Sequence, residues 1–462
     1  MYMREDLSVK QAFEATVQFI RKALKKYTLF VLHLSPHQNM LQGILMYMIA
    51  GWIVLSLPFM DNGEVSLIDN LFTAAAAAST AGLTTVNFAQ SYTFLGKLVV
   101  LIIIQTAGIG YMTMSSFLYL SFSHRLRHRH TEVLNTEFAL PRTVRLQDFL
   151  RAVIIFTLLA ELIGAGFLYN YFIRHDFSPF DATWYAVFHS VSAFCTAGFS
   201  LFPDSLMSFA DSKTINTVIS LLSLAGAMGF IVVTDIFNRI VGRTREISYT
   251  TKIIVFSTLM ALLLCSFFIL ITNPGLAPSA VLFQAIAAMT TSGFNTIPIA
   301  SLAVSSYLVI MALMSIGGSP SGTGGGLKTT TVTCLVATVS SHLFGRKHIT
   351  FLGRQIPLHR LYIANSTFIF YIFMLFVTLF LLTWAEDLPF IELFFEAVAA
   401  LSTAGISLGT TEKLGFLGKL IIIATMIIGR VGVITFGMAL LKRDEDELEE
   451  EEEHLKREDL AV

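Results

Sequence analysis

The stretch Asp69-Asn-Leu-Phe-Thr-Ala-Ala-Ala-Ala-Ala-Ser-Thr-Ala-Gly82 decides the fold, because the chain contains three further versions of it. These versions cover Asp181–Gly198, Ser279–Gly293 and Pro389–Gly405. Each of the four ends in Thr-X-Gly, with a Phe eight residues before the Thr, an Ala three before it and a small polar residue two after the Gly. One such match would be weak evidence, but four at equivalent places indicate an internal repeat.

Each short segment lies between two longer apolar segments, so a long, short, long pattern occurs four times. The long segments cover about 39–59 and 92–122, 149–172 and 214–241, 252–271 and 302–343, and 361–384 and 414–441. A helix needs roughly 20 residues to cross a bilayer, so the short segments are too short to cross comfortably. We therefore expect them to enter the membrane and return on the same side.

The composition excludes a soluble protein, since 54% of the 462 residues are hydrophobic and only 14% are charged. A typical soluble domain has roughly 25% charged residues. The three cysteines are far apart in apolar segments, which argues against a disulfide scaffold or a metal site. The N-terminus begins with charged residues, so no cleavable signal peptide is expected.

The distribution of basic residues tests this topology independently. The connectors 125–151, 239–252 and 346–360 are rich in Lys and Arg, whereas 61–70, 273–279 and 385–388 contain neither. Basic connectors stay in the cytoplasm, and all three do so only if two segments of each repeat cross and the short one re-enters. Both termini are then cytoplasmic.

The prediction is an all-α membrane protein of four M1–pore helix–M2 repeats, with eight transmembrane helices and four re-entrant pore helices around a pseudo-fourfold pore. The repeats cover 39–123, 149–241, 250–345 and 361–441. Residues 1–38 are predicted to form a basic amphipathic segment on the cytoplasmic side, and 442–462 an acidic cytoplasmic tail.

The Thr-X-Gly segments are the candidate ion-binding residues of a selectivity filter: Thr80, Ala81, Gly82, Thr196, Ala197, Gly198, Thr291, Ser292, Gly293, Thr403, Ala404 and Gly405. Non-helical backbone at membrane depth persists only inside protein or along a water-filled cavity. Glycine allows successive carbonyl oxygens to face one axis, where a ring of them replaces the hydration shell of a cation. None of these segments contains Lys or Arg, which favours cations. The alternative is four glycine-ended helices packed for structure alone.

A glycine-rich stretch interrupts the second long segment of repeat 3. We predict that this loop, residues 317–328, lies below the filter and forms a gate through Gly317, Gly318, Gly322, Gly324, Gly325, Gly326 and Lys328. It is not a Walker phosphate loop, because Leu327 separates the last glycine from the lysine. Arg430 in the last apolar segment is costly in a membrane unless it has partners. The loop carbonyls are the expected partners, and snorkelling to the interface is the alternative.

The sequence does not decide the roles of three other features. Glu161, in the first apolar segment of repeat 2, is either a structural hydrogen-bonded carboxylate or a site for a coupling ion or proton. His189 and Glu396 occupy equivalent places in two pore helices, which favours polar packing over a catalytic pair. Glycines 24 to 28 residues after each filter glycine either bend the inner helices or allow close packing: Gly108, Gly226, Gly317 and Gly429.

The four Thr-X-Gly loops, the glycine-rich break and the sequence Ile428-Gly-Arg-Val-Gly432 resemble the Ktr/Trk/HKT potassium transporter superfamily. Over about 39–441 the chain looks most like the membrane subunit of a bacterial Ktr system. The resemblance implies K+ uptake across the plasma (cell inner) membrane, a homodimer with one pore per subunit and a cytosolic nucleotide-binding ring as regulator. Glycine in all four filter segments resembles the K+-preferring members, although the loops lack the Tyr-Gly of tetrameric K+ channels.

On this interpretation the chain is not an enzyme and carries no cofactor of its own. K+ is the transported ion, Na+ dependence is open, and a nucleotide (ATP/ADP or NAD) acts only through the regulatory partner. Membrane lipid is expected around the chain, and nucleic acid is not. The alternative function is a broken-helix secondary transporter that couples Na+ or H+ to a small solute, although such folds usually have two repeats rather than four.

Overall fold

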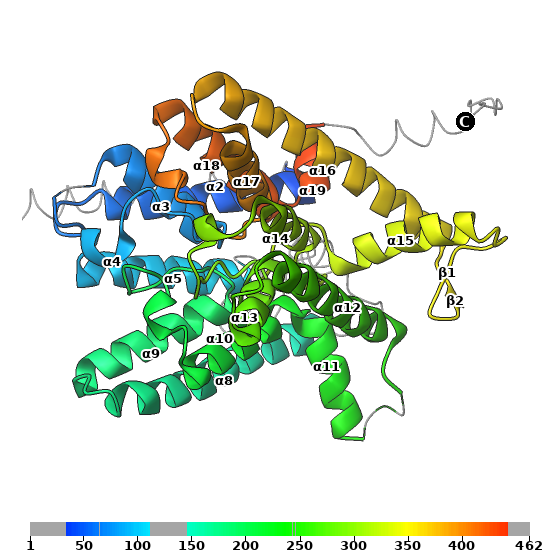
Figure 1. Ribbon diagram of the computed structural model, residues 1–462, viewed down its shortest axis with the longest axis horizontal. Coiled ribbons are helices and arrows are strands. Elements are labelled where there is room, and N and C mark those ends of the chain that lie inside the picture. Colours follow the sequence, from blue (N-terminus) through cyan, green and yellow to red (C-terminus); the bar gives the residue numbers. More distant parts are fainter. Residues whose placement is uncertain (1–33, 64, 111–145, 243, 245, 442–462) are drawn as a thin grey trace, which may run out of the picture.

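The computed structural model describes residues 34–63, 65–110, 146–242, 244 and 246–441. This part of the chain is helical apart from one short hairpin, formed by β1 (Thr350–Phe351) and β2 (Arg354–Gln355) (Figure 1). The acidic tail 442–462 and residues 1–33 of the predicted amphipathic segment lie outside the described residues. So do residues 111–123 of the first repeat.

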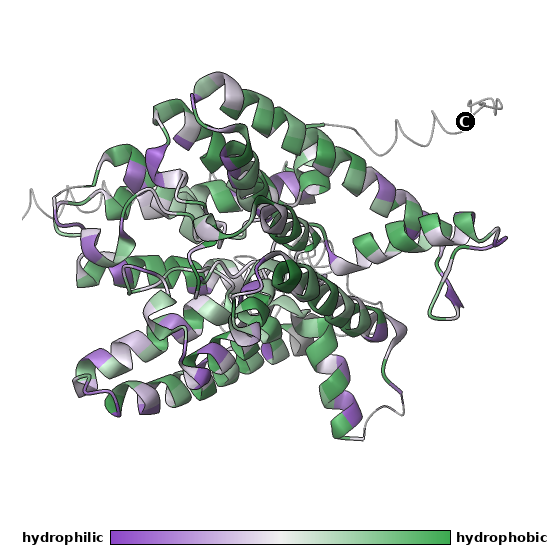
Figure 2. Ribbon diagram, viewed as in Figure 1, coloured by the Kyte–Doolittle hydropathy of each residue, from purple (hydrophilic) through white to green (hydrophobic). Residues whose placement is uncertain are grey.

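Four long helices begin the four repeats, as predicted. They are α2 (Pro36–Leu55), α8 (Leu146–Ile173), α12 (Tyr249–Thr272) and α16 (Leu358–Ala385), and each is long and apolar enough to cross a membrane. Ser35 begins α2 with a capping box, in which its hydroxyl accepts from the N–H of Gln38. Large apolar side chains remain exposed along these helices, among them Leu162 and Ile369, as lipid contact requires. Hydrophobic residues make up most of the long helices α12 and α16 (Figure 2).

The second member of each repeat is a short, buried helix. These are α3 (Leu67–Ala78), α9 (Pro179–Phe194), α13 (Pro278–Met289) and α17 (Phe390–Leu401). With 12 to 16 residues they are roughly 18–24 Å long, less than the ~30 Å of the hydrocarbon core. Serine or proline residues begin them, and the four repeated Phe side chains are buried in their interfaces. Their length and burial agree with the predicted pore helices.

The inner helices are shorter than the sequence predicts, because a glycine with positive φ follows the end of each within two residues. They are α5 (Phe94–Ile109), α10 (Lys213–Ala227), α14 (Val304–Ile316) and α18 (Phe416–Val431). Gly110, Gly229, Gly317 and Gly432 follow them with φ of 91°, 81°, 63° and 89°, angles that favour glycine. Beyond the break, α11 (Gly229–Ile240) turns by 98° from α10, and α19 (Val433–Leu440) by 99° from α18.

These breaks revise the continuous inner spans expected over 214–241 and 414–441. Of the two roles left open for the glycines that follow the filter glycines, a bend is observed at Gly317, whereas the bends near Gly226 and Gly429 lie three residues later. A Cβ at Gly226 would meet the carbonyl oxygen of Phe194, and one at Gly429 that of Leu401, so these two glycines allow the inner helices to pack against the pore helices. Four single helices and two bent pairs meet the criteria for a span, and the count of eight stays a prediction.

The four repeats close into a ring around a common centre (Figure 1). Each inner helix contacts the pore helix of the following repeat, in the pairs α5 with α9, α10 with α13, α14 with α17 and α18 with α3. The last pair joins repeat 4 to repeat 1. Four short elements lie between the pore helices and the inner helices: α4 (Phe88–Ser91), η1 (Met207–Phe209), η2 (Ile299–Ser301) and η3 (Thr411–Lys413). Beyond the break in repeat 3, α15 (Thr329–Leu343) extends away from the ring toward the hairpin (Figure 1).

Candidate functional site

The four pore helices end in the same backbone structure. The N–H of each repeated Thr donates to the carbonyl of the Ala three residues earlier, at 3.1–3.2 Å. The N–H of the next residue donates to the carbonyl five residues earlier, at 2.8–3.0 Å. The Thr residues have φ of 50–56° and the glycines 67–80°. Four threonines in a left-handed conformation that costs energy outside glycine indicate a shared constraint on this backbone.

The four glycines meet the next repeat so closely that no side chain fits. A Cβ on Gly82 would meet the carbonyl oxygen of Ala197, and the other three glycines repeat this contact. The further pairs are Gly198 with Ser292, Gly293 with Ala404, and Gly405 with Ala81. The last pair returns to the first repeat, so the Thr-X-Gly segments form one closed ring of four. The predicted filter residues are therefore brought together.

Two cavities flank this ring. One, of about 290 Å³, touches all four glycines. The described residues that line it include the carboxylates Asp204 and Glu412 and no Lys or Arg, so its charge favours cations. The other, of about 170 Å³, is lined by the glycine-rich loop with Lys328 and Arg430. We call the first the outer vestibule and the second the inner cavity.

Polar side chains of the pore helices hold the backbone that follows the filter. His189 Nε2 lies 3.1 Å from Ser200 Oγ, and Gln284 Nε2 donates to Asn295 Oδ1 at 3.1 Å. Ser407 donates to Glu396 Oε1, and Thr411 Oγ1 donates to Glu396 Oε2 at 2.7 Å. These pairs confirm the polar packing role predicted for this position.

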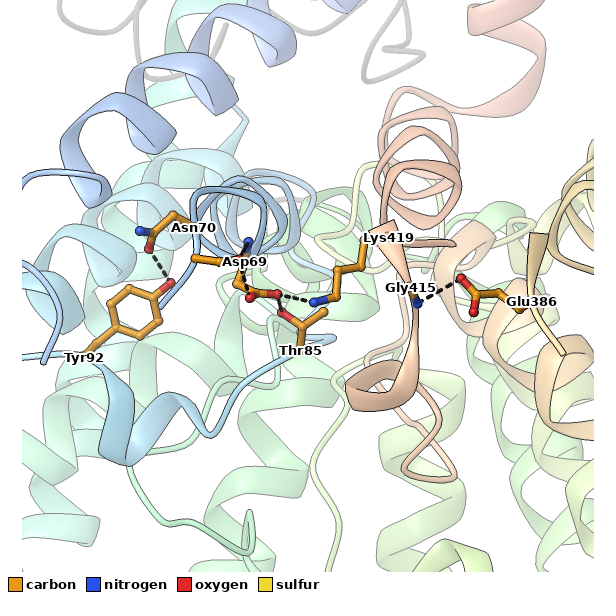
Figure 3. Close-up of polar contacts among 8 residues, drawn as sticks. Asp69, Asn70, Thr85, Tyr92, Glu386, Gly415 and Lys419 are labelled. Carbon is orange, nitrogen blue, oxygen red and sulfur yellow. Dashed lines mark hydrogen bonds and ion pairs between the residues drawn. The ribbon is translucent and has the colours of Figure 1, made fainter. Parts of the chain in front are cut away.

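Repeat 1 uses a different residue for the same purpose. Asp69, at the start of α3, accepts from Thr85 Oγ1 at 2.6 Å, three residues after the filter glycine (Figure 3). The same Asp69 oxygen pairs with Lys419 Nζ of α18 at 2.6 Å, which fastens repeat 4 to repeat 1 (Figure 3). On the other side of this seam, Glu386 accepts from the N–H of Gly415 at 2.9 Å (Figure 3).

The glycine-rich loop lies directly under the filter threonines. Gly325 N–H donates to Thr291 Oγ1 at 2.9 Å, and Thr196 Oγ1 donates to Thr323 Oγ1 at 3.2 Å. The loop is also anchored to the end of α10, where Ser319 N–H donates to the carbonyl of Ala227 at 2.9 Å. Its predicted position between the filter and the inner cavity is therefore observed.

Arg430 connects this loop to the filter. Its Nη1 donates to the carbonyl of Thr323 at 2.7 Å and to Thr80 Oγ1 at 2.9 Å, and its Nη2 donates to the carbonyl of Ala107. The loop carbonyl is a predicted partner, whereas the contacts with Thr80 and Ala107 were not foreseen. A guanidinium bonded to a filter threonine does not snorkel to the interface. Lys328 Nζ donates to the carbonyl of Gly324 at 2.7 Å and adds a second cation here.

Glu161 is a buried hydrogen-bonded carboxylate behind the filter. Gln105 Nε2 of repeat 1 donates to its Oε2 at 2.9 Å, and the thiol of Cys195 lies 3.8 Å from its Oε1. Cys195 directly precedes the filter residue Thr196. Glu161 thus joins two repeats beside the filter, which favours its structural interpretation.

Comparison with known proteins places these features in a family. A family model described as TrkH, cation transport protein, matches residues 18–277 and 271–450. The chain belongs to the TrkH family of cation transport proteins. Its multi-pass membrane character follows from that membership and from the apolar helices.

Individual relatives of the TrkH family align over most of the chain. The Ktr system potassium uptake protein B of Bacillus subtilis is 31% identical over 426 residues, 90% of this chain and 95% of that protein. The potassium/sodium uptake protein NtpJ of Enterococcus hirae is 32% identical over 431 residues, 88% and 93% of the two chains. The crystal structure of the potassium transporter TrkH from Vibrio parahaemolyticus has a TM-score of 0.67 at 21% identity, covers 87% of this chain and 85% of that one, and supports the fold.

Proposed function

We propose that the protein takes up K+ through the ring of four Thr-X-Gly segments, driven by the membrane potential. The observation that carries the proposal is the closed cycle of glycine–carbonyl contacts between an acidic outer vestibule and the inner cavity. Carbonyl oxygens in such a ring replace the water around a cation, and the vestibule carboxylates raise its local concentration. The names of the relatives from B. subtilis and E. hirae support K+ as the ion.

The loop 317–328 is the proposed gate. It lies under the filter, where the Lys328 ammonium and the guanidinium of its tether, Arg430, supply two positive charges. These charges repel an approaching K+ and so oppose ion passage while the loop is closed. Gly and Pro disfavour a helix here by about 1 and 3 kcal/mol each, which keeps the loop unwound. Several hydrogen bonds attach the loop to repeat 2 and one attaches it to Arg430, and these must exchange with other partners when the loop moves.

The remaining parts of the proposal concern the cellular setting. The protein is placed in the plasma membrane with both termini in the cytoplasm, as the basic connectors favour. A homodimer and a cytosolic nucleotide-binding ring are proposed from the resemblance to Ktr and Trk systems. The nucleotide would act on the ring, which would move the loop from the cytoplasmic side.

Growth of a K+-uptake-deficient bacterium on low K+ tests the transport proposal. Cells that produce the protein should grow at K+ concentrations at which the same cells with an empty vector do not. A broken-helix transporter for another solute would leave growth unchanged at every K+ concentration. That result, with the protein detected in the membrane, would refute K+ uptake.

A further inference from the structure

A groove on the outside of repeat 2 is not used by the proposed ion path. It runs between α8 and α10 and has a volume of about 820 Å³. Its walls are apolar, and Leu159, Ile163 and Leu221 on them are each more than half exposed. Both helices belong to apolar spans, so the open side of the groove faces the hydrocarbon of the bilayer.

The polar residues of the groove gather at one end. They are Lys213, Thr214 and Thr217, all in the first turns of α10, at the end of the bundle where the outer vestibule lies. Other lysines at this end have partners: Lys97 donates to a carbonyl, and Lys413 and Lys419 pair with carboxylates. Within the described part of the chain, Lys213 has no hydrogen bond or ion pair, and Asp211 nearby does not pair with it.

The length of the groove fits one leaflet. Its residues on α10 run from Lys213 to Ala225, a rise of about 18 Å at roughly 1.5 Å per residue. This distance reaches slightly beyond the middle of a hydrocarbon core of about 30 Å. An ammonium at the interface and an apolar channel of this length match the phosphate and one acyl chain of a phospholipid.

We propose that the groove binds one phospholipid of the vestibule-side leaflet, with an acyl chain between α8 and α10 and its phosphodiester at Lys213. The hydroxyls of Thr214 and Thr217 add donors beside the ammonium. Charge complementarity decides for a phospholipid over a neutral lipid, because a basic residue at the interface attracts the phosphate.

The floor of the groove packs against the pore helix that leads to the filter, so a lipid bound in the groove can affect the filter. A Cβ at Gly164, in the floor, would lie 2.8 Å from Ser190 Oγ of the pore helix α9. Ser190 Oγ donates to the carbonyl of Glu161 at 2.6 Å. A chain bound here therefore contacts Gly164, which packs directly against the pore helix α9, and its loss should loosen that packing.

Binding is tested on the purified full chain by native mass spectrometry. The protein is titrated with phosphatidylglycerol, phosphatidylcholine and diacylglycerol, which has the same acyl chains without the phosphate. We expect one phospholipid to be retained and diacylglycerol to be retained roughly fivefold less, the effect of about one basic residue near a head group. Lys213→Gln should remove this difference, whereas Arg174→Gln, an exposed change at the end of α8 outside the groove, should not.

A second pair of variants tests the apolar part. Leu221→Trp narrows the groove, and Leu263→Trp adds the same side chain at an equally exposed position on α12, outside the groove. Retention of phospholipid should fall only in Leu221→Trp. Equal retention in the two tryptophan variants, or in Lys213→Gln and wild type, would overturn the proposal.

The consequence for transport rests on the proposed function and has its own readout. Rubidium uptake is measured in liposomes made of phosphatidylglycerol or phosphatidylcholine. Uptake should be lower in Leu221→Trp than in wild type, and Leu263→Trp should match wild type. If wild type carries no rubidium, the proposed function fails while the binding experiment still decides the lipid site. If Leu221→Trp loses lipid and keeps full flux, the link from groove to pore helix is wrong.

Discussion

At the scale of single residues, the filter and the loop below it are joined by side chains. Three of the four repeated threonines contact the loop or its tether: Thr80 through Arg430, Thr196 through Thr323, and Thr291 through the N–H of Gly325. The hydroxyls of these three threonines thus link the filter to the glycine-rich loop below it. These direct hydrogen bonds are the route by which the proposed gate would act on the filter.

Arg430→Ala should raise rubidium flux into liposomes. The substitution removes hydrogen bonds between a charged group and Thr323, Thr80 and Ala107, each worth about 1.5–3 kcal/mol. If these bonds favour the closed loop, flux should rise roughly tenfold or more. Deletion of Gly322–Gly325 should have the same effect and weaken dependence on any cytosolic regulator.

Arg360→Ala, a change at an exposed position near the start of α16, is the control for loss of one arginine. A purely structural loop predicts misfolding or reduced flux instead. Lower or equal flux in both well-folded gate variants, compared at matched protein amounts, would rule the gate out.

At the scale of elements, each inner helix is only 13 to 16 residues long, and a glycine follows its end within two residues. Gly110 and Gly432 even share nearly the same backbone angles, with φ of 91° and 89° and ψ of 124° and 131°. The breaks leave room below the filter, where the glycine-rich loop of repeat 3 fits.

Gly432→Ala should therefore destabilise the protein, because alanine is strained at φ 89° by about 1–3 kcal/mol. Thermal unfolding in detergent measures this as a lower Tm. Gly166→Ala is the matched control, since it lies within helix α8 and its Cβ would meet nothing within 4 Å. An equal Tm for the two variants would show that the break at Gly432 is not required.

At the scale of the whole molecule, the seams between repeats are built from different chemistry. Repeats 4 and 1 are joined by Lys419 and Asp69, and repeats 1 and 2 by Gln105 and Glu161. Repeats 2 and 3 are joined through the carbonyl of Asn295, which accepts from Leu206 N–H at 3.0 Å. These three seams therefore differ in the groups that join them, although all four share the glycine–carbonyl contact of the filter.

The sidedness of the ring is tested by cysteine labelling in a background without Cys265 and Cys334. An impermeant thiol reagent added outside intact cells should label Gly63→Cys and Gly275→Cys, and should not label Ser248→Cys. All three positions are exposed, so access depends on the side of the membrane alone. Labelling of Ser248→Cys from outside would contradict the eight-span topology.

The sequence predicts the pore helices and the filter segments of this ring, but not the breaks in its inner helices. The repeated Thr-X-Gly spacing locates the pore helices and the filter residues, because all four repeats share the same local sequence pattern. The breaks at Gly229 and Gly432 were missed, since a glycine in an apolar run does not reveal its φ. The contact of Arg430 with Thr80 joins residues 350 positions apart, which no local pattern can pair.

The most direct test of the account is the relative flux of K+ and Na+ into liposomes that contain only this protein, wild type or Gly82→Ser. A side chain at Gly82 would meet the carbonyl oxygen of Ala197 and displace one quarter of the ring. We predict that wild type prefers K+ and that Gly82→Ser lowers this preference roughly tenfold, about 1.4 kcal/mol. Gly63→Ser, at an open glycine with φ 86°, should leave it unchanged. An unaltered preference in well-folded Gly82→Ser would contradict the assignment of the four-loop ring as the filter.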